Sequence, residues 1–289
     1  MRNGRFADAW AISDADLKAR DPATRDDPAL PYHLRWVWDG RSFDGRHVLV
    51  RCYHGLGDTI QFARFLPLLA TRAASVTVEA QPALYPLLAQ LPGVARWVPF
   101  DVAHPVPPSE CDIEITELPP ALRASPADVP VPYLKAPPAP VPDRMLAICH
   151  RAGEWDAARS IPQALFAAIC AAHATLTLVA APSDLDVLNP EGCPLDMQAT
   201  AALVAAAELV LTVDTMIAHL AGALGRPTWL LLKADPDWRW TPGASDSCWY
   251  PTMRIYAQTR AGDWSDVLAR VARDLPSALA SSAKEVAYG

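Results

Sequence analysis

The chain has 289 residues, 51% of them apolar, and a formal net charge of −7. This composition is typical of a folded globular protein, and the length accommodates two domains, each with its own core. The sequence contains no run of Lys or Arg, which argues against a nucleic-acid interface or a basic membrane patch. It does not exclude a small anionic substrate, because a few local donors are enough to bind one.

Six cysteines are spread along the chain without a C-x-x-C pair. Several lie in apolar runs, so we expect buried, reduced thiols rather than a disulfide framework or a zinc site. The first residues lack the apolar core of a signal peptide, and no apolar stretch is long enough to span a bilayer. We therefore expect a cytoplasmic protein.

In the first half of the chain, strand and helix patterns alternate. Residues 3–20 predict one amphipathic helix, and an aromatic cluster of Tyr32, Trp36 and Trp38 follows. From His47 onward, apolar β-branched runs alternate with helical periodicity. The expected strands are 47–53, 75–80, 95–100 and 112–116, and the expected helices are 59–73 and 82–90. This alternation predicts a parallel, doubly wound α/β sheet.

A proline-rich segment then interrupts the pattern, and its composition predicts an extended, semi-rigid linker. The alternation restarts after it, with expected strands at 145–150, 175–181, 209–214 and 228–233. The expected helices of this half are 162–173, 199–208, 217–224 and 264–275. The predicted division is an N-terminal segment 1–40, a Rossmann-like domain 41–125, a linker 126–143 and a second Rossmann-like domain with a closing helix 144–289. Two such domains facing each other across a cleft suit the joining of an activated donor to a second substrate.

The stretch Gly55-Leu-Gly-Asp58-Thr-Ile-Gln61 lies between a predicted strand and a predicted helix. Gly55 and Gly57 permit a positive φ and a close approach of the backbone to a ligand. Asp58 has two interpretations at this point. Its carboxylate satisfies the first amides of the helix, or it accepts a proton from a substrate hydroxyl as a general base.

The stretch Val213-Asp214-Thr215-Met-Ile-Ala-His219 repeats this design in the second half. The amides at its helix start and the Thr215 hydroxyl are suited to a phosphate, and His219 lies one turn further on. Arg159 precedes another predicted helix, where it can clamp a pyrophosphate. The alternatives are a packed histidine and a solvated arginine. Lys233 follows a predicted strand, where open α/β sheets bind ligands and where a plain surface lysine is equally expected.

Taken together, these stretches resemble the two signature regions of heptosyltransferase-like GT-B glycosyltransferases. The resemblance rests on Gly55-Leu-Gly-Asp-Thr-Ile-Gln-Phe-Ala-Arg-Phe-Leu-Pro67 and on Asp214-Thr-Met-Ile-Ala-His-Leu-Ala-Gly-Ala-Leu-Gly-Arg-Pro227. It is closest to a bacterial branch fused behind tetratricopeptide repeats, whose C-terminal signature resembles Asp235-Pro-Asp-Trp-Arg-Trp240 and Trp249-Tyr-Pro251. Residues 4–10 resemble a remnant of a last repeat helix.

The resemblance implies an inverting, metal-independent transfer of a sugar from a nucleotide-diphosphate donor to an acceptor hydroxyl. It implies that Asp58 is the catalytic base, with the acceptor on the first domain and the donor on the second. The expected donor and phosphate site comprises Arg159, Asp214, Thr215, Met216, His219 and Lys233. The expected acceptor or cleft residues are His54, Gly55, Gly57, Thr59, Gln61 and Trp238. No metal and no cofactor beyond the donor sugar are expected, and the acceptor is a glycan, a lipid or a protein.

Two other classes of function stay open at this point. One is a sugar-nucleotide epimerase or hydrolase on the same twin-domain fold, which needs further acid–base carboxylates. The other is a sugar-nucleotide-binding or scaffold protein without catalysis. The second is motivated by Cys52-Tyr53-His54, where relatives carry a more polar turn, and by Met216, where they carry a small residue. The D-x-D pattern at Asp235 recurs elsewhere in the chain and does not indicate a metal site.

Overall fold

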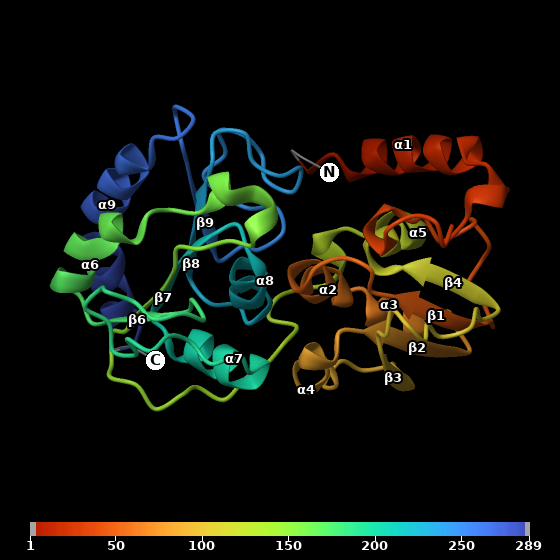
Figure 1. Cartoon of the computed structure of the whole chain (residues 1–289), viewed down its shortest axis with the longest axis horizontal. Helices are drawn as coiled ribbons and strands as arrows, with labels where there is room; N and C mark the ends of the chain where they lie inside the picture. The colour runs from red at the N-terminus through yellow and green to blue at the C-terminus, as the bar shows by residue number, and fades with distance from the viewer. Residues whose placement is uncertain (1–3, 287–289) are drawn as a thin grey trace. The chain divides into compact units, whose positions relative to one another are not determined.

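The computed structural model describes residues 4–286, so residues 1–3 and 287–289, with the first residue of the predicted helix 3–20, lie outside the described part (Figure 1). Contacts within the chain divide it into two compact units, and the boundary falls between Leu134 and Lys135. Each unit is built on its own parallel sheet. The predicted α/β class with two parallel sheets is therefore confirmed.

The first unit has a four-stranded sheet in the order β3-β2-β1-β4. The strands are β1 (His47–Arg51), β2 (Ser75–Ala80), β3 (Arg96–Pro99) and β4 (Cys111–Glu114). Val48 of β1 pairs with Val76 on one side and with Cys111 on the other. The run Val48–Val50 of β1 is buried throughout, which is typical of a central strand in a parallel sheet that is covered on both faces. The strand order reverses between β1 and β4, which makes this edge of the sheet a topological switch point.

Helices precede, connect and follow these strands. They are α1 (Phe6–Ala19), α2 (Leu56–Ala63), α3 (Leu66–Ala70), α4 (Tyr85–Leu88) and α5 (Leu118–Leu122). Single 3-10 turns are η2 (Pro22–Thr24), η3 (Tyr32–Leu34), η4 (Pro82–Leu84), η5 (Ile115–Glu117) and η6 (Pro126–Asp128). The prediction of one helix over 59–73 was wrong, because Pro67 stands in the first turn of α3. A proline is tolerated there, whereas inside a longer helix it clashes with the preceding turn.

The second unit has a five-stranded parallel sheet in the order β6-β5-β7-β8-β9. The strands are β5 (Leu146–Cys149), β6 (Thr175–Thr177), β7 (Leu209–Val213), β8 (Thr228–Leu232) and β9 (Met253–Ala257). The edge strand β9 was not predicted. Strands β6 and β7 flank β5 on opposite sides, so the strand order reverses between β5 and β7. The carboxyl ends of these two strands are where an open α/β sheet binds ligands.

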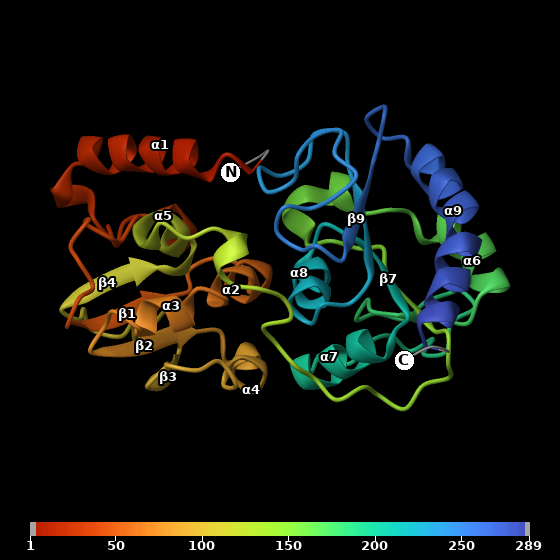
Figure 2. The same ribbon diagram turned by 180° about the vertical axis from the view of Figure 1, so that it is seen from behind.

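Helices cover both faces of this second sheet. They are α6 (Ala167–Ala172), α7 (Met197–Ala206), α8 (Met216–Ala223) and α9 (Trp264–Val286), with 3-10 segments η7 (Glu154–Arg159) and η8 (Gln163–Phe166). Both views show α6 and α9 on one face and α7 and α8 on the other (Figures 1 and 2). The core between α9 and the sheet includes Phe166, Leu211 and Val267, each fully buried. Because β5 and β7 pair in parallel, their carboxyl ends lie at the same edge of the sheet.

Three features outside the sheets bear on the other expectations. Beyond η6, residues 129–145 contain no helix or strand; the role of this segment as a linker stays a prediction. All six cysteines are free thiols and five are buried, as expected, while Cys248 is exposed. Among the described residues, no helix is long and apolar enough to cross a membrane.

Candidate functional site

The first candidate cluster lies at the turn after β1, where α2 begins. Gly55 is the N-cap of α2 and Asp58 its third residue, and the Gly55 amide donates a hydrogen bond to Asp58 Oδ2 at 3.1 Å. Asp58 thus satisfies an amide at the helix start while its side chain stays partly exposed. Gly55 has φ −69°, and Gly57 is a helical residue of α2. Gly55 therefore does not use the positive φ that a glycine permits, and a close approach of the backbone to a ligand stays a prediction.

Polar side chains at the ends of the two neighbouring strands hold this turn. Glu114, at the end of β4, is 1% exposed, and its Oε1 lies 3.0 Å from His54 Nδ1. Its Oε2 accepts a hydrogen bond from the Thr116 amide at 2.7 Å. Gln81, just after β2, donates to the His54 carbonyl at 2.7 Å. His54, whose side chain is 31% exposed, is therefore held on a rigid support.

Two expected acceptor residues lie away from solvent. Thr59 and Gln61 are both 0% exposed, and the Thr59 hydroxyl donates to Gln81 Oε1 at 3.0 Å. The helical period turns positions 59 and 61 toward the interior, and the assignment of these two residues to the acceptor site stays a prediction. A second buried group beside the turn was missed by the sequence reasoning. Arg51 pairs with Glu79 at 2.9 Å and with Asp112 at 2.7 Å.

The second candidate cluster lies at the carboxyl ends of β5 and β7 in the second unit. Thr215 is the N-cap of α8, with φ −153° and no side-chain bond to the helix. Thr215 and Met216 are both partly exposed. The amides of a first helical turn have no partner inside their own helix, and the helix dipole adds positive potential there. This end of α8 is thus suited to an anion.

Arg159 joins this helix start to the neighbouring strand. It is 9% exposed, and its Nη1 donates to the Asp214 carbonyl at 2.7 Å. Asp156 lies between two cations, with its Oδ2 2.8 Å from Lys233 Nζ and 3.8 Å from Arg159 Nε. The structure therefore brings together Arg159, Asp214 and Lys233, which the sequence placed on three separate segments.

The carboxyl of Asp214 is 7% exposed. Burial, aided by the negative charge of Asp237, raises the pKa of this carboxyl to about 6. The indole of Trp240 and the charge of Arg159 act in the opposite direction. Asp214 therefore changes its protonation state close to neutral pH, which is unusual for an aspartate.

His219 lies beneath the helix start. It is 5% exposed, its Nδ1 lies 3.1 Å from Tyr250 Oη, and its ring stacks on Trp240 at 5.8 Å between centroids. Burial lowers the pKa of His219 well below its usual range, so the ring is neutral at pH 7. A methyl group on Gly222 would meet the Tyr250 ring at 2.4 Å. His219 is therefore a packed histidine, as one of the two interpretations of the sequence expected. Its contact with an anion stays a prediction.

Two tryptophans of the second unit present their rings to solvent. Trp238 is 40% exposed, with the Arg239 guanidinium 4.6 Å from its ring centroid. Trp155 is 77% exposed and was not predicted as a site residue. Its ring lies against Arg159. The sequence feature that could have pointed to Trp155 as a site residue is its position four residues before Arg159.

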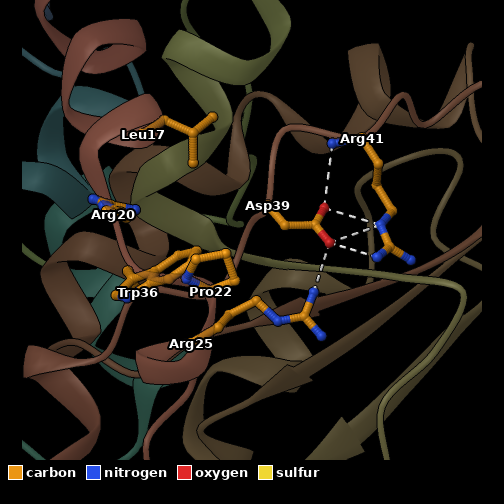
Figure 3. Close-up of a pocket in the computed structure, with 7 residues that line it drawn as sticks. All are labelled: Leu17, Arg20, Pro22, Arg25, Trp36, Asp39 and Arg41. Atoms are coloured by element: carbon orange, nitrogen blue, oxygen red, sulfur yellow. Dashed lines mark hydrogen bonds and ion pairs between the residues drawn. The ribbon is translucent and has the colours of Figure 1, made fainter.

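Two cavities lie apart from these clusters. One, of about 330 Å³, is formed by α1 and the loop that follows, with Arg20 and Trp36 on one side and Asp39 with Arg41 on the other (Figure 3). Asp39 there accepts a hydrogen bond from Arg25 at 2.7 Å. The other, of about 280 Å³, is lined by residues 170–175 and 186–188. Neither contains a predicted site residue, and within residues 4–286 no group of three His, Cys, Asp or Glu side chains is placed to hold a metal ion.

Comparisons with known structures agree with this architecture. A glycosyltransferase family 9 protein from Veillonella parvula DSM 2008 superposes with a TM-score of 0.58 at 10% identity, covering 83% of this chain and 99% of that one. The ADP-heptose lipopolysaccharide heptosyltransferase II of E. coli gives 0.57 at 16% identity, covering 81% and 99%. E. coli heptosyltransferase WaaC with ADP-2-deoxy-2-fluoro heptose gives 0.55 at 12%, covering 80% and 99%. The likeness confirms a GT-B-like fold.

Two comparisons of sequence also relate this chain to known proteins. Protein FlbA of Caulobacter vibrioides is 35% identical over 100 residues, which are 34% of this chain and 16% of FlbA. The aligned stretch thus spans about a sixth of that relative. The family model for glycosyltransferase family 9 (heptosyltransferase) matches residues 98–246, just over half of the chain. That range includes Arg159 and the start of α8 but not Asp58. The chain therefore belongs to glycosyltransferase family 9, the heptosyltransferase family.

Proposed function

We propose that the protein is an inverting glycosyltransferase that moves a sugar from a nucleotide-diphosphate donor to an acceptor hydroxyl without a metal ion. The observation that carries the proposal is the cluster at the carboxyl ends of β5 and β7. There the start of α8, the Arg159 guanidinium and Lys233 lie within one compact unit, with Asp156 between the two cations. Such a group of donors stabilises the diphosphate as its bond to the sugar breaks.

The proposed donor site comprises Arg159, Thr215, Met216 and Lys233. Asp214 and His219 support it from below, since both are buried. Asp214 holds Arg159 through its backbone carbonyl. His219 keeps Tyr250 and Trp240 packed under α8. Solved structures of family members carry ADP or an ADP-heptose analogue, so an ADP-linked sugar is the first donor to test.

The proposed acceptor site lies on the first unit, at the turn from His54 to Asp58. Asp58 is partly exposed and is held in place by the Gly55 amide. We assign it the role of general base: its carboxylate accepts the proton of the acceptor hydroxyl as that oxygen attacks the anomeric carbon. The diphosphate leaves with the electron pair of the broken bond. The acceptor is a glycan, a lipid or a protein.

The finer family assignment is also a proposal. We place the chain in the branch associated with tetratricopeptide repeats. Two observations support this placement: the resemblance of residues 4–10 to a repeat helix, and α1, which has no fully buried residue in the described structure.

The test begins with binding. A ligand that binds the folded state raises its melting temperature in proportion to occupancy, so a thermal-shift panel of ADP-, UDP- and GDP-sugars identifies the donor. The selected donor is then incubated with glycan, lipid and peptide acceptors, with and without EDTA. Transfer with inversion that survives EDTA supports the proposal. Donor binding without turnover across the panel contradicts it and favours the binding or scaffold function. Donor consumption without an acceptor favours an epimerase or a hydrolase.

A further inference from the structure

Trp155 is the feature of the second unit that the donor site described above leaves unused. It lies in η7 (Glu154–Arg159), the first helical segment after the carboxyl end of β5. Its side chain is 77% exposed. Isolated exposed apolar residues are common on protein surfaces. What distinguishes Trp155 is that its ring contacts the guanidinium of Arg159.

One face of the Trp155 ring lies against a buried cation. The Arg159 guanidinium carbon is 3.9 Å from the ring centroid, within the range of a cation–π contact. Arg159 itself is 9% exposed and bonds to the Asp214 carbonyl at 2.7 Å. These two distances and one C–N bond of the guanidinium together place the ring centroid within about 8 Å of the Asp214 carbonyl oxygen. Asp214 directly precedes Thr215, the N-cap of α8. A nucleoside diphosphate bridges a separation of this order between its phosphates and its base.

The segment that carries the ring is anchored at its centre. Asp156, the next residue, is held by Lys233 at 2.8 Å and lies 3.8 Å from Arg159 Nε. Gly153, two residues before Trp155, lies next to the ring: a methyl group there would sit in contact with Trp155 Cδ1, at 3.4 Å. The ring thus stands on a braced segment, with one face on Arg159 and much of its remaining surface open.

We propose that Trp155 stacks on the base of the nucleoside diphosphate whose phosphates bind Arg159 and the start of α8. The inference rests on the proposed function, since it places the base of that same donor. Every nucleobase has a π-face, so stacking gives affinity with little choice among bases. In this arrangement Arg159 binds the phosphates directly. It also supports the Trp155 ring, which covers the base.

The test compares the binding of three probes by calorimetry: pyrophosphate, ADP and UDP. Trp155→Ala is the main variant, Trp155→Phe keeps an aromatic ring, and Leu195→Ala is a control at another exposed apolar side chain (89% exposed). Base–aromatic stacking measured by truncation predicts a loss of roughly tenfold or more in ADP and UDP affinity for Trp155→Ala. Pyrophosphate affinity stays unchanged. Trp155→Phe retains most of the affinity, and Leu195→Ala matches the wild type.

The outcomes separate this inference from the function on which it rests. Equal ADP affinity in Trp155→Ala and wild type overturns the stacking role and leaves the donor site standing. An equal loss for pyrophosphate and ADP also overturns it, because Trp155 then acts only by positioning Arg159. If no probe binds the wild-type chain, the proposed function fails as well.

Discussion

Gly222→Ala tests the packing that supports the start of α8. A Cβ at this position would lie 2.4 Å from Cγ and Cδ1 of Tyr250 and 2.7 Å from its Cε1. Carbon atoms in contact prefer about 3.5–4.0 Å, so the ring has to move by about 1 Å. Tyr250 is fully buried and holds His219 Nδ1 at 3.1 Å. The shift therefore strains the core and weakens that bond.

The expected magnitude follows from opposing effects. Overpacking a core costs about 1–3 kcal/mol, and losing one hydrogen bond costs about 1 kcal/mol. Alanine gains about 1 kcal/mol over glycine in a helix interior. The net expectation is a loss of about 1–3 kcal/mol in the free energy of unfolding.

Urea denaturation followed by circular dichroism measures this loss. Tyr250→Leu and the double variant Gly222→Ala/Tyr250→Leu complete a double-mutant cycle, in which relief of the clash gives a coupling energy of about 1 kcal/mol or more. If Gly222→Ala is as stable as the wild type, or more stable, the packing argument beneath α8 is refuted.

Three further predictions address the two clusters directly. Asp58→Asn is expected to lower the transfer rate by roughly 10²–10⁴-fold, the range for loss of a general base, with the donor Kd unchanged; unaltered turnover rules out the base assignment. Arg159→Ala is expected to weaken ADP binding by roughly 10–100-fold through loss of charge-assisted hydrogen bonds, measured by calorimetry, and an unchanged Kd counts against the donor site. Because burial raises the pKa of Asp214 to about 6, its contribution to folding stability is fully present at acid pH and declines as pH rises through that value. Denaturation from pH 4 to 7 therefore shows a decline in wild type that Asp214→Asn lacks, and parallel profiles contradict this.

Much of the fold could be predicted from the sequence because parallel strands leave a plain signal. The strands β1, β7 and β8 contain buried runs that are largely apolar. After β1 and β7 come residues suited to a helix start, and the helices α2 and α8 follow there. The edge strand β9 lacks this signal, since the exposed Arg254 interrupts its apolar run. The split between α2 and α3 follows from Pro67, which the helical periodicity on either side concealed.

The candidate site was less predictable, because its geometry depends on contacts between distant segments. The sequence placed Thr215 and Lys233 just after predicted strands and Arg159 just before a predicted helix. The parallel sheet brings the ends of β5, β7 and β8 to one edge. It did not indicate that Asp156 lies between Lys233 and Arg159. The role of Glu114 could not be predicted from the sequence either, since its contact with His54 depends on the pairing of β4 with β1.

The most direct test of the account is a crystal structure of the protein soaked with ADP. We expect the diphosphate oxygens within hydrogen-bond distance of the Arg159 guanidinium and of the amides at Thr215–Ile217. A diphosphate bound elsewhere on the chain, or an α8 start blocked by protein atoms in the presence of saturating ADP, would contradict the central claim.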